Sequence, residues 1–325
     1  MVATKETKLP LETSSSSSTP LKNANPLEGM VNFLKGKPEF EGTIKSYPLA
    51  QILNDKSSYG LFLKQGELAK AGWYGLTHNG KDYDHTYNDG KSESGILFDN
   101  PHIVVVSQSP RFIELTKDCD RGKRSTIVGI HSDEDGHSIP QGVAFYDELK
   151  EQGVASLRTF YLIYLFNAEK EPLHKVPFCL SIKGVAASSF GKALTAFEND
   201  FYTMASSLDE DIAPLNQVSR SLFIWSPKFV PSLEPKDAPT KSWVAIVQEG
   251  QSVFSPIADS NEEIETWNRK FNVIRKANNN FANRFCEQFN EETGLHAMAI
   301  EGTNPNIKAL PANLMTVDAE FDVSA

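Results

Sequence analysis

Short apolar runs separated by turn residues dominate the chain from Tyr59 onward. Glycine, proline, Asn-Gly and Asp-Gly separate these runs, a pattern typical of strands joined by tight turns. Eight runs predict strands: YGLFL, GILFD, HIVVVS, STIVGI, TFYLIYLF, KVPFCLSIKG, SLFIWS and WVAIVQ. Many short strands with short connections favour an antiparallel sheet or an OB-like barrel.

The clearest predicted hairpin joins residues 159–166 to residues 173–183 through the turn-rich NAEKEP. The first of its strands is apolar on both faces, as expected of a strand in the interior of a sheet. The second alternates: Val176, Phe178, Leu180 and Ile182 share one face, and Pro177, Cys179, Ser181 and Lys183 share the other. One face of that strand is therefore core, and the other is exposed or lines a groove.

Two segments have the spacing of amphipathic helices. Residues 188–206 place apolar side chains three and four residues apart: Phe190, Leu194, Phe197, Phe201 and Met204. Residues 260–292 begin with a capping box of Ser260 and Glu263. They continue with an aromatic-rich stripe: Ile264, Trp267, Phe271, Ile274, Phe281, Phe285 and Phe289. This second helix is expected to pack on its own core or on a partner.

The resulting fold class is α+β, a β-rich antiparallel sheet or OB-like barrel with two amphipathic helices, the second long and C-terminal. Residues 1–26 contain five consecutive serines and no apolar face, which predicts a disordered tail. The rest of the chain is expected to form a core domain over residues 27–256, the long helix within 257–296 and a second tail over 297–325. Residues 74–94 are polar and aromatic, and are expected to form a surface loop or a mobile hairpin.

Composition adds constraints on location and partners. No stretch approaches the ~20 apolar residues of a membrane span, and residues 1–20 contain no apolar run of the kind found in signal peptides, so neither export nor membrane insertion is expected. The three cysteines, Cys119, Cys179 and Cys286, are scattered, which fits a reducing, cytoplasmic location. The net charge of −10 means that any nucleic-acid binding must come from a local basic face.

Catalytic and metal-binding motifs do not emerge from the sequence. GKRST at residues 122–126 lacks the upstream glycine of a phosphate-binding loop. His174 and Cys179 would alternate to opposite faces of one strand, so they cannot form a nucleophile–base pair. Five residues have side chains that can bind metals, but their spacing matches neither a helical nor a zinc-ribbon metal site: His78, Asp82, Asp84, His85 and Asp89. We therefore expect a non-enzymatic binding protein with no metal or cofactor.

Basic residues interleaved with aromatic residues are the remaining signal. Cations neutralise phosphates while rings stack on bases, so this mixture is typical of proteins that bind single-stranded DNA or RNA. The candidate residues are Arg121, Lys123, Arg124, Arg158, Lys183, Trp73 and Tyr74.

Three segments resemble an uncharacterised domain family met in cyanobacteria and their mobile elements: KSSYGLFLKQGELAKAGW, GILFDNPHIVVVSQSP and PLHKVPFCLSIKGVAASSFGKALTAFENDF. The resemblance covers roughly residues 45–230 and implies no catalytic residue. More distantly, Lys183-Gly184 before a helix and the acidic, aromatic C-terminus resemble phage-type single-stranded DNA-binding proteins, although few acidic residues stand in that tail. The alternative function is a structural or protein-interaction component of a mobile element or phage-like system, acting through the 260–292 helix.

Overall fold

The computed structural model describes residues 47–277, except 88–89, 116–126, 134, 235, 237–239 and 249–252. The predicted tails and the part of the long helix beyond Ala277, including Phe281, Phe285 and Phe289, lie outside the described residues. So do the basic residues Arg121, Lys123 and Arg124.

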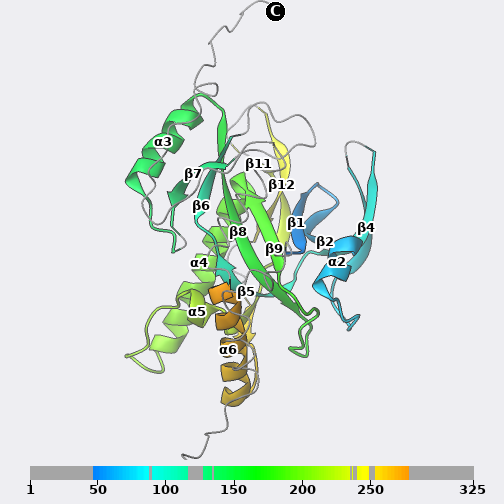
Figure 1. The fold of residues 1–325 in the computed structure, drawn as a ribbon, viewed down its shortest axis with the longest axis vertical. Helices are drawn as coiled ribbons and strands as arrows, with labels where there is room; N and C mark the ends of the chain where they lie inside the picture. Colours follow the sequence, from blue (N-terminus) through cyan, green and yellow to red (C-terminus); the bar gives the residue numbers. More distant parts are fainter. Residues whose placement is uncertain are drawn as a thin grey trace, which may run out of the picture. The chain divides into compact units, whose positions relative to one another are not determined.

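A large open sheet forms the centre of the described part (Figure 1). Its main path runs, in spatial order, through β13 (Val253–Pro256), β10 (Phe223–Ser226), β5 (His102–Gln108), β8 (Ala155–Phe166), β9 (Phe178–Lys183), β1 (Leu49–Asn54), β2 (Tyr59–Lys64), β4 (Ser92–Phe98) and β3 (Lys81–Thr86). A branch adds β6 (Arg111–Leu115) and β7 (Ile127–Ser132), with β6 paired to the first half of β8. A separate two-stranded sheet pairs β11 (Phe229–Glu234) with β12 (Ser242–Val247).

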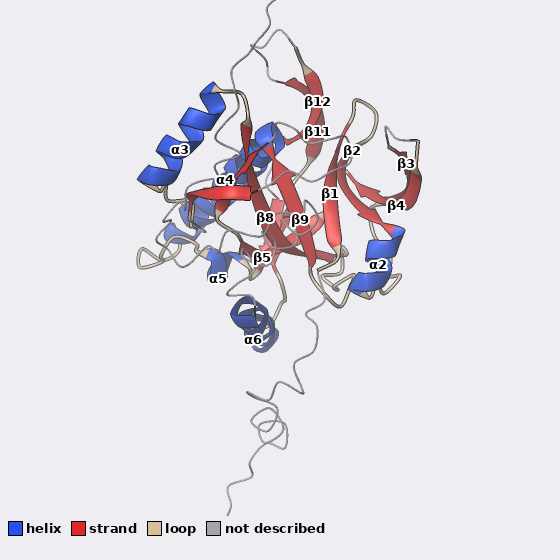
Figure 2. Cartoon of the chain, turned by 45° about the horizontal axis from the view of Figure 1, so that its top comes forward, coloured by secondary structure: helices blue, strands red, loops and turns tan. Residues whose placement is uncertain are grey.

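The described part contains five helices: α2 (Gln65–Ala71), α3 (Pro140–Glu151), α4 (Gly184–Ser206), α5 (Gln217–Arg220) and α6 (Asn261–Ala277). They lie around the strands (Figure 2). The predicted α+β class is therefore confirmed. None of these helices is long and apolar enough to span a membrane.

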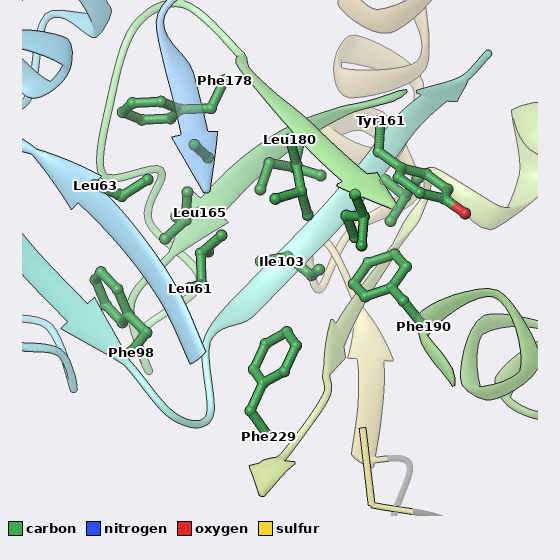
Figure 3. Close-up of a cluster of buried hydrophobic side chains, with 14 of the residues drawn as sticks. Leu61, Leu63, Phe98, Ile103, Tyr161, Leu165, Phe178, Leu180, Phe190 and Phe229 are labelled. Atoms are coloured by element: carbon green, nitrogen blue, oxygen red, sulfur yellow. The ribbon is translucent and has the colours of Figure 1, made fainter. Parts of the chain in front are cut away.

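Strand β8 separates two hydrophobic cores because its side chains alternate between the two faces of the sheet. Tyr161, Ile163 and Leu165 pack in a core with Phe190, Leu194 and Phe197 of α4 (Figure 3). Phe160, Leu162 and Tyr164 pack in a second core with Phe271 of α6. The sheet is thus covered by α4 on one face and by α6 on the other.

The eight predicted strands are all present, but their arrangement differs from the expected one. The large sheet is not a closed barrel, and β1 runs parallel to β9, with Leu49 opposite Cys179. An antiparallel sheet or barrel was therefore the wrong arrangement. The predicted β8–β9 hairpin and the burial of β8 on both faces are confirmed.

The predicted helix over residues 188–206 is present as α4, and the described part of the second, up to Ala277, is helical as α6. In α4, Phe190, Leu194 and Phe197 are buried, whereas Met204 is 49% exposed near the end of the helix. The backbone N–H of Glu263 donates to Ser260 Oγ at 3.3 Å, which is one of the two hydrogen bonds of the expected capping box. The polar segment 74–94 contains strand β3, which forms a hairpin with β4.

Candidate binding pocket

A pocket of about 870 Å³ lies between α4 and the face of β8 that α4 covers. We call it the α4 pocket. It is lined by Gln108, Arg111, Asp135, Gly136, His137, Leu157, Thr159, Tyr161, Gly184, Ala187, Ser188, Gly191, Lys192, Leu194, Thr195, Ala196, Glu198, Asn199, Leu215, Asn216, Gln217 and Arg220. The α4 residues among them, from Gly184 to Asn199, extend over about 22 Å at the ~1.5 Å rise of a helix.

Alternate residues of β8 form one wall of the pocket: Leu157, Thr159 and Tyr161. The ring of Tyr161 is buried against Phe190, with ring centroids 4.9 Å apart. Its hydroxyl points away from the apolar side chains labelled in Figure 3. Burial raises the pKa of Tyr161 to about 12, so at neutral pH the hydroxyl stays protonated and can donate a hydrogen bond.

Small residues of α4 form the opposite wall. Gly184, Ala187, Ser188 and Gly191 occupy positions i, i+3, i+4 and i+7, so they share one face of the helix and leave room beside it. The helix begins without a side-chain cap from Lys183 and without an acidic residue in its first turn. Its unpaired N–H groups therefore add a partial positive charge at the Gly184 end.

Arg220 of α5 is the most unusual side chain of the lining because its guanidinium is buried and only partly paired. The residue is 5% exposed, and Nη1 donates to Glu198 Oε1 at 2.5 Å. The Nε and Nη2 atoms have no hydrogen-bond partner among the described residues.

The same edge of another arginine shows what these two nitrogens can bind. Arg158 donates from Nε and from Nη2 to the two carboxylate oxygens of Glu114, each at 2.7 Å. Parallel N–H groups on this edge match the two oxygens of a carboxylate or phosphate group. Arg220 therefore has an unpaired fork suited to an oxyanion.

The charge of the lining points the same way. Arg111 is half-buried and Lys192 is exposed, and with Arg220 they outnumber the two carboxylates of the lining, Asp135 and Glu198. In a chain with a net charge of −10, this pocket is locally positive.

Gln217 of α5 contacts the loop that contains Asp135 and the end of β5 at Gln108. Its Nε2 donates to Asp135 Oδ1 at 3.4 Å, and its Oε1 accepts from the backbone N–H of Gln108 at 3.2 Å. Asn216 caps α5 by accepting from the N–H groups of Val218 and Ser219. These contacts position the short helix that carries Arg220.

The structure brings together two of the residues predicted to bind nucleic acid. Arg158 and Lys183 are directly opposite one another on β8 and β9. Lys183 is exposed, but the Arg158 side chain is only 11% exposed and is held by Glu114 and by Ser181 Oγ, at 2.5 Å. Arg158 alternates with the pocket residues of β8, so it faces the opposite side of the sheet.

The aromatic candidates lie elsewhere. Trp73 stacks on His174, with centroids 6.1 Å apart and planes at 8°, and Tyr74 is 54% exposed. His174 accepts a hydrogen bond from the N–H of Leu165, near the far end of β8 from Arg158. Seven residues at ~3.3 Å each separate those positions by about 23 Å. The described candidates therefore form two groups and not one face.

Sequence reasoning missed Arg220, and no local motif could have revealed it. Its partner Glu198 lies 22 residues earlier, and the wall that it faces comes from a strand further upstream. No group of three or more metal-ligating side chains occurs in the part of the chain that the structure describes.

Comparison with known proteins identifies a family without assigning an activity. A model of a domain of unknown function, DUF5895, matches residues 44–253, which is more than half of the chain. No curated protein and no solved structure matches. The matched range contains every residue that lines the α4 pocket. The chain therefore belongs to the DUF5895 family.

Proposed function

We propose that this chain is a non-enzymatic binding protein that holds an anionic ligand in the α4 pocket. The observation that carries the proposal is the buried guanidinium of Arg220, whose Nε and Nη2 lack partners among the described residues. A buried donor left without a partner costs about 1–3 kcal/mol, and a ligand oxyanion would remove that cost.

The size and chemistry of the pocket support an organic ligand. Its volume of about 870 Å³ falls in the range typical of small-molecule sites, ~300–1,000 Å³. Burial raises the pKa of Tyr161 to about 12, so its hydroxyl is protonated at neutral pH, and a guanidinium carries hydrogen-bond donors only; both buried groups can therefore donate to a ligand. Such a lining suits binding better than acid–base catalysis.

The test is anion-dependent thermal stabilisation of the full chain. Inorganic phosphate, citrate and adenosine monophosphate are the probes, each compared with sodium chloride at equal ionic strength. A ligand at 100 times its Kd stabilises the folded state by about 2.7 kcal/mol. We expect at least one probe to raise the melting temperature of the wild type in a saturable way.

Matched variants assign that stabilisation to the pocket. Arg220→Lys keeps the charge but loses the fork, and the double variant Arg111→Met with Lys192→Met removes the other two cations. Arg269→Met is the control, because Arg269 is exposed on α6 and does not line the pocket. Stabilisation that is absent for every probe, or equal in all four proteins, would refute the proposal.

Single-stranded nucleic acid is the second candidate ligand. The exposure of Lys183 and Tyr74 favours this candidate. The residues predicted to bind it also include Arg121, Lys123 and Arg124. Fluorescence anisotropy with labelled oligo-thymidine tests it, with a triple charge reversal at those three basic residues. Each phosphate neutralised should contribute about −0.7 to the slope of log affinity against log salt. Salt-independent binding, or binding unchanged by the reversal, contradicts this candidate. The proposed location is the cytoplasm, which cell fractionation tests.

A further inference from the structure

A second concave surface lies beside the C-terminal half of α4, and its chemistry is the opposite of that of the α4 pocket. It encloses about 500 Å³ and is lined by Phe201, Ile212, Ala213, Pro214, Leu215, Asn216, Ser219, Leu222, Phe223, Pro256 and Ile264. We call it the apolar groove. Its floor is built from packed rings, since the centroids of Phe201 and Phe223 lie 4.4 Å apart.

Exposed apolar side chains are concentrated in the segment that contributes most of the groove lining. Met204 is 49% exposed, Leu208 84%, Ile212 37% and Val218 40%. Four of the ten large hydrophobic side chains exposed in the described part thus fall within one stretch of 15 residues. A concentration of exposed apolar side chains beside a concave apolar surface is typical of an interaction site.

The rim of the apolar groove is acidic on two sides. Asp209, Glu210 and Asp211 immediately precede Ile212, and Glu262, Glu263 and Glu265 flank Ile264 on α6. All six side chains are exposed, and none forms an ion pair with a described residue. Among the residues that the structure describes, no lysine or arginine lines the groove itself. The surface therefore combines apolar contact area with unneutralised negative charge.

We infer that the apolar groove docks a basic amphipathic segment of a partner protein. Apolar side chains of the segment would occupy the groove, as amphipathic helices do in hydrophobic grooves. Its lysines and arginines would face the six carboxylates, and this complementarity would accelerate association and select the partner. A second copy of the chain fits less well, because each copy has a net charge of −10 and the same acidic rim.

The experiment measures binding of a fluorescein-labelled peptide of 18 residues, made of leucine and lysine in helical i, i+3, i+4 spacing, to the full chain. The control peptide has glutamate at every lysine position. We expect saturable binding of the lysine peptide that weakens with added salt, and no binding of the glutamate peptide.

Variants assign the binding to the groove. Leu208→Ser with Ile212→Ser removes exposed apolar area, and Asp209→Asn, Glu210→Gln, Asp211→Asn removes one side of the rim. Each should raise the Kd at least about tenfold, because a few central apolar side chains carry most of the affinity of an interface. Val273→Ser is the control, because Val273 is 67% exposed and does not line the groove.

Three outcomes would overturn the inference. The first is equal binding of the lysine and glutamate peptides, and the second is a Kd unchanged in both groove variants. The third is a wild-type dimer in sedimentation that Leu208→Ser with Ile212→Ser converts to a monomer, because a second copy would then cover the groove. Unchanged circular dichroism and melting temperature show that the variants remain folded.

Discussion

Protonation of the buried imidazole of His174 should destabilise the fold as the pH falls. The residue is fully buried, and its ring stacks on Tyr164 at 5.0 Å with planes at 4°. Its Nε2 accepts from the N–H of Leu165 at 2.8 Å, which places the ring proton on Nδ1, where it donates to the carbonyl oxygen of Val176 at 2.7 Å. The neutral ring is thus satisfied on both nitrogens, and a second proton would displace the Leu165 hydrogen bond.

The size of the effect follows from the pKa. Burial lowers the pKa of His174 to about 3, against ~6.5 in an unfolded chain. Because the folded pKa is the lower one, the unfolded state binds the proton first as the pH falls. The contribution is complete above pH ~6.5 and is lost at ~1.4 kcal/mol per pH unit on the way down to the folded pKa. Between pH ~7.5 and ~5.0 the loss attributable to this group is roughly 2 kcal/mol.

Urea denaturation at a series of pH values between those limits measures this loss, with His174→Gln for comparison. Burial also lowers the pKa values of His85, His102 and His131, so the wild type alone cannot isolate one residue. Those three histidines contribute equally to both proteins, and the difference between the two pH slopes belongs to His174. The variant should be less stable at pH ~7.5 but should lose less stability on acidification. Parallel slopes would refute the reasoning.

Three further perturbations test the packing of the fold by chemical denaturation. Arg158→Met should lower the free energy of unfolding by about 3–5 kcal/mol, because it leaves the fully buried Glu114 without its guanidinium partner. A loss below ~1 kcal/mol would mean that this ion pair does not stabilise the fold. Gly142→Ala should lower the free energy of unfolding by about 1–3 kcal/mol, because a Cβ there would lie 1.8 Å from a carbonyl oxygen of β7. Gly66→Ala is the control: it has open space around it in α2 and should be neutral or stabilising. Phe271→Ala should cost about 3–5 kcal/mol because the ring is fully buried between α6 and the sheet, and an unchanged midpoint would mean that α6 does not pack there.

Periodicity predicted the elements whose burial is simple and missed those that are polar or depend on distant contacts. The continuous apolar run of β8 indicates burial on both faces of a strand. The apolar stripe of α4 indicates burial of one face of a helix. Strand β3 lies in the segment 74–94, for which the polar sequence left a surface loop and a hairpin open, and its register is fixed by pairing with β4. The parallel pairing of β1 with β9 joins residues about 130 positions apart, which no local pattern encodes.

The candidate site shows the same limit more strongly. The sequence offers Arg158 as a basic residue near aromatic ones and Lys183 as a basic residue at the end of a strand, but it could not show that Glu114 holds the guanidinium of Arg158. Arg220 gives no signal, because its importance comes from burial and from an unpaired edge. Charge can be counted in a sequence, whereas pairing and desolvation depend on which distant segments the fold brings into contact.

The open sheet has a consequence for strand pairing between molecules. An unclosed sheet exposes backbone N–H and C=O groups along its outer strands, where a strand from another molecule could add. On one margin, β3 carries exposed Lys81, Asp82 and Asp84. On the other, β13 is four residues long and ends at Pro256, which has no N–H to donate. The charged side chains of β3 and the short, proline-terminated strand β13 should therefore suppress intermolecular strand addition and amyloid-like growth at these two edges.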